Sequence, residues 1–475
     1  MHGRQDFLDF PAAFGGPVLR PGDAGYSDAR AIFNARKIED TPALIARAAD
    51  EADVLTAVRY AADTGNALAV RSGGHGIDGS VMPHGGLVLD VSQLKRTELD
   101  QQTGVARLGA GVLLGEMDQF LNDYGLVVPA GTVSTTGVAG LTLGGGIGFN
   151  TRRYGATVDS LLACDVVTTD GRRVRASAQE NADLFWALRG GGGNFGVVTA
   201  FEFQAHPIPS TVAAGFIVFD LDQADEVMTQ LSDHMPTAPR ELGVICAIAH
   251  CPPLPGVAAD SVGELMVLLA IVYSGPEDHT DAVVGGLSGL GRPNVTAVQR
   301  VPWPTANSML DALAPYGRRA HSAGGYLSKL TSPAIRIAVA HAEISPKPTA
   351  PPAPSAVQEI WAAGGAFSDD FAEDSAALSR EGARWFWEAA AFWDDPADDH
   401  RLMSWIDALR TEIRPQLQSN CYVNLSVDQG PEWRRGIWGS ADKYRRLVEA
   451  KTKWDPHNML RANKNIEPVT VGAAN

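Results

Sequence analysis

The sequence predicts an α+β protein with more than one domain. Its 475 residues exceed what one simple core organises, so two domains are expected. Residues 44–70 have the pattern strand–helix–strand, and residues 158–176 have that of an antiparallel hairpin turning at Asp170-Gly171. Helices and antiparallel strands in one chain favour the α+β class.

The first strand–helix–strand unit ends in a glycine-rich loop. Leu44 to Ala48 is a predicted strand, Asp50 or Asp53 caps the next helix, and Gly65 lies just past its end. A buried strand at 67–70 then leads into Arg71-Ser72-Gly73-Gly74-His75-Gly76. Glycine lets backbone N–H groups approach an anion, and the loop presents His75 from a rigid turn. The alternative is a tight turn with a purely structural histidine.

A second glycine-rich stretch covers residues 140–148. Strands are expected at 86–91 and 105–110, and a helix at 113–124 precedes the stretch. It contains Gly140, Gly144, Gly145, Gly146 and Gly148, enough glycine for a large flat ligand to lie against bare backbone. Together the two stretches indicate phosphate or nucleotide binding.

A third stretch imitates a dinucleotide fingerprint. Residues 191–196 fit G-x-G-x-x-G, but the alternating run at 197–203 predicts a following strand. The fingerprint has meaning only before a helix whose amino terminus faces the pyrophosphate. A Rossmann NAD site is therefore disfavoured.

The middle of the chain alternates between helix and strand signals. A helix is expected at 222–234, a strand at 265–273 and a helix from Ser332. Five prolines within 346–354 predict a stiff connection, either a domain linker or, as we favour, an inner loop, because strand signals resume at Val357 and Trp385. The final segment predicts a strand at 422–427 and a helix capped by Ser440 and stopped at 455–456.

Composition excludes several classes of partner. The net charge of −16 argues against nucleic acid, whose phosphates require basic surface. No membrane-spanning window and no apolar signal core occur. The four cysteines fit neither a metal pattern nor a disulfide framework, so buried thiols and a cytoplasmic protein are expected. Oligomeric state is not predicted.

Four ordered motifs carry a family resemblance. They are the loop at 71–75, the segment 129–137 with the glycines to 148, the block 183–199, and the terminal segments 422–424 and 454–466. Together they resemble the berberine bridge enzyme-like family, whose flavin domain is of the vanillyl-alcohol oxidase, or PCMH, type. The resemblance implies a two-part FAD-binding domain, residues 1–207 and 415–475. It also implies an inserted substrate domain, residues 208–414, with an antiparallel sheet flanked by helices.

The resemblance also implies the cofactor and its attachment. FAD would be bonded through a ring nitrogen of His75, with a single link, because Thr132-Val133-Ser134 stands where many relatives place a second, cysteine link. The residues expected to bind it are Arg71, Ser72, Gly73, Gly74, His75, Gly76 and Ser80; Thr135, Thr136, Gly137, Gly140, Leu141, Gly144, Gly145, Gly146 and Gly148; Val197 and Val198; and Tyr422, Asn463 and Asn465.

Glu388 and Tyr422 are the candidate catalytic residues. Residues 380–393 resemble the family's strand that faces the flavin, and a carboxylate among tryptophans would have a raised pKa suited to a general base. The alternative places Glu388 on the sheet's solvated side. Tyr422 matches a tyrosine near the flavin ring, and a buried core tyrosine is its alternative.

The function this implies is that of an FAD-dependent oxidase. It would oxidise a C–H next to an alcohol, amine or phenol-like group of a small molecule, with O₂ as acceptor and H₂O₂ as product. One alternative is a flavin-N5-oxygen monooxygenase, because residues 130–141 are similar to a bacterial branch that includes the enterocin-pathway flavoenzyme; Thr136 and Leu141 would line its oxygen pocket. Another is a flavin-binding protein without turnover.

Overall fold

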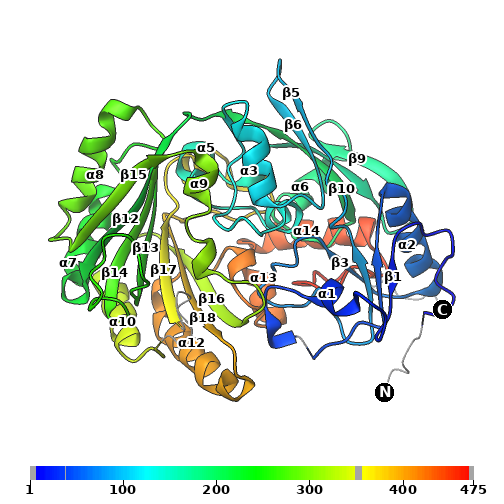
Figure 1. Ribbon diagram of the computed structural model, residues 1–475. Helices are drawn as coiled ribbons and strands as arrows, with labels where there is room; N and C mark the ends of the chain where they lie inside the picture. Colours follow the sequence, from blue (N-terminus) through cyan, green and yellow to red (C-terminus); the bar gives the residue numbers. More distant parts are fainter. Residues whose placement is uncertain (1–6, 38, 348–355, 470–475) are drawn as a thin grey trace.

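The computed structural model describes residues 7–37, 39–347 and 356–469. Two smaller sheets lie on one side of the molecule and one seven-stranded sheet on the other (Figure 1). Helices and antiparallel strands are mixed throughout, which confirms the α+β prediction. Most of the proline-rich segment lies in 348–355, outside the described residues.

The four-stranded sheet delivers the first glycine loop. Its order is β1 (Val18–Leu19), β2 (Leu44–Arg47), β4 (Leu87–Asp90) and β3 (Leu68–Arg71), and β4 is parallel to both β2 and β3. Helix α2 (Glu51–Thr64) connects β2 to β3; α1 (Tyr26–Arg30) precedes β2. The Asp50 side chain caps α2, and Gly65 ends it at φ 70°. Each predicted element of this unit is therefore present.

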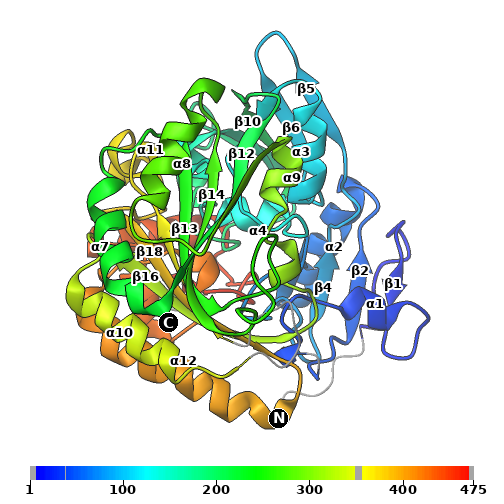
Figure 2. The ribbon, with the colours of Figure 1, turned by 60° about the vertical axis from the view of Figure 1, so that its left-hand side comes forward.

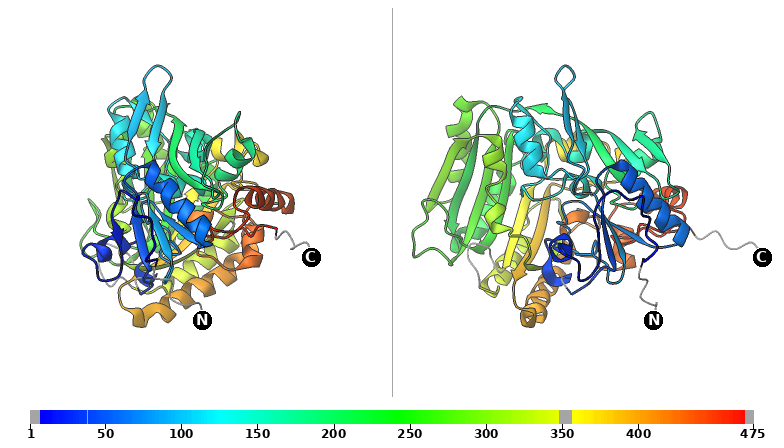
Figure 3. Two further views of the ribbon diagram at one scale, coloured as in Figure 1. Left: turned by 90° about the vertical axis from the view of Figure 1, so that its right-hand side faces the viewer. Right: turned by 45° about the vertical axis from the view of Figure 1, so that its right-hand side comes forward.

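The five-stranded sheet is antiparallel. Its order is β5 (Thr97–Asp100), β6 (Val105–Gly109), β10 (Val197–Gln204), β8 (Leu161–Val167) and β9 (Arg173–Ser177). The β5–β6 hairpin projects from the body in both views of Figure 3. Between these strands the chain forms α3 (Leu114–Asn122), α4 (Val138–Leu143), α5 (Thr151–Tyr154) and α6 (Ala182–Leu188), and the last helix of the described residues is α14 (Ala441–Trp454). One core joins α14 to both smaller sheets, so the chain's last segment packs with its first.

The seven-stranded antiparallel sheet has the order β15 (Val295–Val301), β12 (Val212–Asp220), β14 (Leu265–Tyr273), β13 (Leu242–His250), β17 (Ala356–Ala362), β18 (Trp385–Trp393) and β16 (Arg319–Leu327). Its outer face is covered by α7 (Ala224–His234), α8 (Thr280–Ser288), α10 (Ser332–Glu343) and α12 (Asp399–Ile413) (Figure 2). Shorter elements are α9 (Trp303–Asn307), α11 (Ala366–Asp369), α13 (Pro431–Gly436), and the pair β7 (Leu126–Val127) and β11 (His206–Pro207).

Strand alternation divides the seven-stranded sheet into two faces. On β18, Trp385, Trp387 and Trp393 pack in the core under the covering helices. The intervening Phe386 and Phe392 belong to a second core between the sheet and the rest of the molecule. Period-two alternation therefore places Glu388, which has the same parity as Phe386, on the inner face.

The predicted strand at 422–427 is wrong. The chain forms a 3-10 turn there, η9 (Val423–Leu425). Its polar groups find partners without a neighbouring strand: Asn424 Nδ2 donates to the Leu141 carbonyl (3.0 Å), and the Leu425 carbonyl accepts from Ser322 Oγ (2.6 Å). Satisfied backbone groups and anchored side chains remove the need for a ladder.

Two absences expected from the sequence can be compared with the structure. Cys164, Cys246, Cys251 and Cys421 are all buried and form no disulfide, which confirms the expected buried thiols. Within residues 7–37, 39–347 and 356–469, no helix combines the length and apolar character needed to cross a bilayer.

Candidate functional site

A cavity of about 460 Å³ lies between the glycine-rich loops and the inner face of the seven-stranded sheet. We call its two sides the glycine wall and the sheet wall. The glycine wall comprises cavity-lining residues of 71–76, 131–141 and 191–198. The sheet wall comprises cavity-lining residues of β13, β14, β17 and β18. The two walls come from segments far apart in the sequence.

The first loop is held by an ion pair and by a backbone contact that only glycine permits. Arg71, at the end of β3, donates to the buried Asp90 carboxylate (2.8 Å). A Cβ on Gly73 would lie 2.4 Å from the Gly137 nitrogen, far inside van der Waals contact. The loops at 71–76 and 131–141 therefore meet through bare backbone, which fixes the relative position of these two parts of the glycine wall.

His75 lies within an aromatic enclosure on this wall. Its ring stacks on Phe33 with centroids 4.0 Å apart and meets the Tyr316 ring edge-on at 6.1 Å. Burial lowers the pKa of His75 to about 4, so the imidazole is neutral at neutral pH. Its Nε2 is buried and has no partner among the described residues. A neutral ring nitrogen is the form that can act as a nucleophile.

Some residues of the second glycine stretch line the cavity, and others pack against side chains behind it. Thr136, Gly137, Gly140 and Leu141 line the cavity. Thr135, Gly144, Gly145, Gly146 and Gly148 do not; the three glycines 144–146 lie under Tyr422 and Asn424. A Cβ on Gly144 would lie 2.0 Å from Asn424 Oδ1, so this glycine makes room for a side chain of the chain itself. Any cofactor contact of these five residues stays a prediction.

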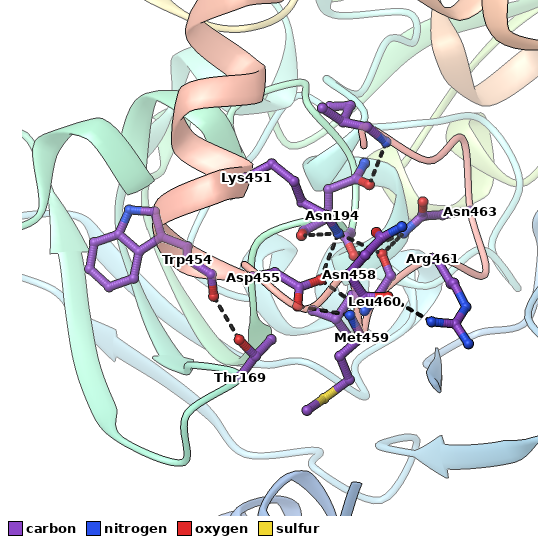
Figure 4. Close-up of polar contacts among 12 residues, drawn as sticks. Thr169, Asn194, Lys451, Trp454, Asp455, Asn458, Met459, Leu460, Arg461 and Asn463 are labelled. Carbon is purple, nitrogen blue, oxygen red and sulfur yellow. Dashed lines mark hydrogen bonds and ion pairs between the residues drawn. The ribbon is translucent and has the colours of Figure 1, made fainter. Parts of the chain in front are cut away.

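A buried ion pair fastens the terminal segment to the third glycine stretch (Figure 4). Lys451 Nζ donates to Asp455 (2.6 Å) and to the carbonyls of Asn194 and Leu460. Asp455 in turn accepts from the Met459 and Leu460 backbone N–H groups. The pair therefore ties the end of α14 both to the loop at 191–196 and to the segment that follows.

That segment brings one of its two predicted asparagines to the cavity. Asn463 lines the cavity and donates to the Gly193 carbonyl (3.0 Å), whereas Asn465 lies outside the lining. The Oδ1 atoms of both are buried without a partner among the described residues. The loop at 191–196 runs into strand β10 rather than a helix, which confirms that it is not a Rossmann fingerprint. Val197 and Val198 line the cavity.

Glu388 is on the sheet wall, and a second carboxyl faces it. Strands β17 and β18 pair antiparallel with Glu359 directly opposite Glu388, and both residues line the cavity. Burial, and then the neighbouring Glu359, raise the pKa of Glu388 well above its usual range. Burial raises the pKa of Glu359 to about 7, while the Trp361 indole N–H donates to its carboxyl (3.0 Å). A buried carboxyl with a raised pKa can act as a base near neutrality.

Sequence reasoning missed Glu359. The alternation of Val357, Glu359 and Trp361 does place these three side chains on one face of a strand. Only the pairing register between β17 and β18 places this glutamate beside Glu388. No local pattern contains that information.

Tyr422 is a buried phenol at the cavity surface. Its hydroxyl accepts from the Gly146 N–H (3.1 Å) and from Asn424 Nδ2 (2.9 Å). Burial raises its pKa to about 12, so it is neutral at physiological pH. It lines the cavity and meets the Phe386 ring edge-on, so both the predicted site position and the core alternative describe part of its role.

The residues present fit a large flat cofactor. The glycine wall exposes backbone at Gly74, Gly76 and Gly140. A Cβ built on Gly76 or Gly140 would have no atom of the described residues within 4 Å, so there is open space above both. On the cavity lining, buried polar atoms at His75 and Asn463 lack partners among the described residues, although such groups are ordinarily satisfied. Arg71, Ser72, Gly73 and Ser80 line the same surface. A planar ligand that also carries N–H or O–H donors would lie against this backbone and give the Asn463 Oδ1 a partner.

Comparison with known proteins agrees with this geometry. Residues 42–177 match the family description "FAD binding domain", and residues 421–467 match "Berberine and berberine like". The FAD-linked oxidoreductase YgaK of Bacillus subtilis is 30% identical over 465 residues, 96% of this chain and 97% of its own. (R)-6-hydroxynicotine oxidase of Paenarthrobacter nicotinovorans is 34% identical over 287 residues, 60% of each chain. The crystal structure of 6-hydroxy-D-nicotine oxidase from Arthrobacter nicotinovorans superposes with TM-score 0.85 at 26% identity, covering 97% of this chain and 99% of that one.

Proposed function

Because the chain belongs to the berberine bridge enzyme-like family of FAD-linked oxidases, we propose that it oxidises a C–H next to an alcohol, amine or phenol-like group. The proposed products are the oxidised small molecule and H₂O₂, with O₂ as acceptor. Bound FAD would supply the two-electron oxidant. The proposed division of labour assigns FAD to residues 1–207 and 415–475, and substrate to residues 208–414.

We propose covalent attachment of FAD through His75. Its imidazole is neutral, is oriented by Phe33 and Tyr316, and has a ring nitrogen without a protein partner. Val133, which lines the cavity, stands where a second link would need a cysteine, and none of the four cysteines belongs to the lining. The attachment is therefore single.

The observation that carries the proposal is the position of Glu388. Its carboxyl lies on the sheet wall, opposite the glycine wall, in the same cavity as His75. A base at this place can take the substrate's proton while hydride leaves from the adjacent carbon. The apolar neighbours Ala390 and Phe392 exclude water, which strengthens the electrostatic effect of the carboxyl.

The test is anaerobic flavin reduction. The flavin-loaded protein is mixed without oxygen with panels of alcohols, sugars, amines and polyketides, and its visible absorbance is followed. Bleaching by one class, recovered on admitting air with formation of H₂O₂, supports the proposal. No bleaching by any class, in protein that carries flavin, contradicts an oxidase and favours the flavin-binding protein without turnover.

One observation favours an oxygenase as the second candidate. Thr136 and Leu141, the two residues expected to line an oxygen pocket, both line the cavity. Incorporation of ¹⁸O from ¹⁸O₂ into the product distinguishes this reaction from an oxidase, in which all the oxygen leaves as H₂O₂.

A further inference from the structure

Glu359 and Glu388 form a carboxyl pair that a single-base mechanism does not require. Directly opposed residues on antiparallel strands have Cβ atoms about 4.5–5.5 Å apart. Both side chains lie on the inner face of the sheet, and Glu388 is only 6% exposed. Two ionised carboxylates so close together in a desolvated place repel each other strongly. The arrangement is stable if one of them holds a proton.

The two carboxyls have different hydrogen-bond partners. A hydrogen bond from Ser322, on the adjacent strand β16, lowers the pKa of Glu388, against the larger effects of burial and of Glu359 that raise it. Glu359 accepts from the Trp361 indole N–H (3.0 Å). Each carboxyl therefore has a donor beside it that stabilises its charged form, and either can be the ionised member.

No unpaired cation of the described chain faces the pair. The other titratable side chains that line the cavity are Arg71, His75, Asp78, His250, Tyr422 and Lys464. Arg71 is paired with Asp90, and Lys464 with Asp78 (2.5 Å). His75 is neutral, and His250 lies against the Gly263 carbonyl (2.9 Å). The pair therefore keeps one net negative charge.

Apart from His250 at the end of β13, the rest of the sheet wall is largely apolar. The side chains that surround the pair come from β13, β14, β17 and β18, namely Ile245, Ala247, Leu268, Ala270, Val357 and Ala390. A polyhydroxylated substrate would leave its hydroxyls without partners on such a surface. A ligand with an apolar body and one positive charge would complement it.

We propose that Glu359 and Glu388 share one proton and form the anionic end of the substrate cavity, so that the enzyme's substrates are apolar amines bound as ammonium ions. This inference rests on the proposed oxidase function, because it names the substrate class and the proton acceptor of that reaction. The pair acts as a unit: one member is ionised and the other is its hydrogen-bonded partner.

The proton and electron balance is complete with this pair. The ammonium N–H proton passes to the ionised carboxylate, which leaves a neutral amine and two protonated carboxyls. The amine lone pair then forms the C=N bond as the adjacent C–H leaves as hydride, carrying two electrons to the bound FAD. The substrate departs as an iminium ion, and O₂ takes the two electrons in the oxidase reaction.

The substrate class is tested by binding two ligands of the same shape to the flavin-loaded protein. Phenyltrimethylammonium carries a positive charge and tert-butylbenzene does not. Neither can react by the proposed route, because the quaternary nitrogen has no N–H proton to lose and tert-butylbenzene has no nitrogen. Calorimetry and the flavin spectrum report binding. We expect the cation to bind at least about tenfold more tightly, since close opposite charges in a dry site couple strongly.

Variants assign this preference to the pair. The double variant Glu359→Gln/Glu388→Gln should lose the preference while its affinity for tert-butylbenzene stays unchanged. Glu343→Gln, an exposed carboxyl on α10, is the matched control and should keep it. Equal affinities in the wild type, or a preference that survives in the double variant, would overturn the inference. Bleaching of the flavin by an alcohol would then still support the oxidase.

The shared proton is tested by the pH dependence of the same binding. Interacting carboxyls titrate in two macroscopic steps. The cation affinity of the wild type should therefore rise with pH in two steps, and binding near the upper step should release a proton, measured in buffers of different ionisation enthalpy. Glu359→Gln keeps an acceptor for Trp361 and leaves a single step. Two steps in that variant, or one step in the wild type, would refute proton sharing.

Discussion

The two walls of the cavity are made from different parts of the polypeptide. On the glycine wall the surface is backbone, and the important contacts are between main-chain atoms, such as the approach of Gly73 to Gly137. On the sheet wall the surface is side chains, and their chemistry depends on which residues two strands place opposite each other. Glu359 and Glu388 are 29 positions apart and meet only through the register of β17 and β18.

The two walls therefore select their ligands in different ways. A backbone surface selects a ligand by its shape and by the direction of the main-chain N–H groups, and it changes little when other residues are substituted. A side-chain surface sets the charge and the proton inventory of the site, and one substitution changes it. The glycine wall therefore suits a constant cofactor, and the sheet wall suits selection of a substrate.

Replacing His75 should have the largest effect, because it removes the proposed covalent bond between the protein and FAD. In the wild type we expect the yellow colour to stay with protein precipitated by acid. His75→Ala should release all its flavin to the supernatant, since neither a cysteine nor a second histidine lines the glycine wall. The measurement is the absorbance of the two fractions. Release of flavin from acid-treated wild type would contradict covalent attachment.

Substitution of Glu388 tests the sheet wall next. Glu388→Gln keeps the size and hydrogen bonding but cannot accept the proton, so anaerobic flavin reduction should slow by about 10²–10⁴. Flavin content and melting temperature should not change. A variant that reduces its flavin at nearly the wild-type rate would place the base elsewhere.

The wild-type reduction rate should also depend on pH in a defined direction. The carboxylate is the active form, and its pKa is raised by burial and by the neighbouring glutamate. The rate should therefore be lost as the pH falls through a value above that of ordinary glutamate, and recovered above it. A profile that stays flat down to the ordinary glutamate range would show that Glu388 does not titrate in the reaction.

Lys451 tests how the glycine wall is fastened to the terminal segment. Lys451→Met leaves the Asp455 charge buried and unpaired, which typically costs about 3–5 kcal/mol of unfolding free energy. Denaturant unfolding measures this cost. Lys453→Met is the control two residues along α14, where the exposed pair with Asp183 is worth about 1 kcal/mol or less. Equal losses in the two variants would argue against a special role for the buried pair.

Substituting two glycines of the glycine wall should have the smallest effects, and these separate a structural role from a ligand-binding role. A Cβ on Gly137 would lie 2.6 Å from the Gly73 nitrogen, so Gly137→Ala should destabilise even the flavin-free protein by about 1–3 kcal/mol. A Cβ on Gly140 would meet no atom within 4 Å, so Gly140→Ala should leave that protein stable. Its methyl group would project into the cavity and lower the fraction of protein that binds flavin. Equal flavin content in Gly140→Ala and the wild type would place the ligand away from this surface.

Most elements near the amino end were predictable because their signals are local. The cap at Asp50, the end of α2 at Gly65 and the turn at Asp170-Gly171 each depend on residues a few positions apart. The segment at 422–427 failed because its apolar alternation resembles a strand, whereas Asn424 and the Leu425 carbonyl bond to distant partners. Long-range hydrogen bonds overrode the local preference.

From the sequence alone, four motifs resemble the FAD-linked family. Glycine spacing and the following strand pattern, which are local in the sequence, predict the loop that presents His75 and argue against a Rossmann site. Only the tertiary structure decides which glycines face the cavity and which make room for Asn424. It alone shows that Glu359 meets Glu388 and that Lys451 is buried with Asp455 beneath the loop at 191–196. The reason is physical: charge, desolvation and proton sharing depend on which groups are near in space, and strand register and packing determine that nearness.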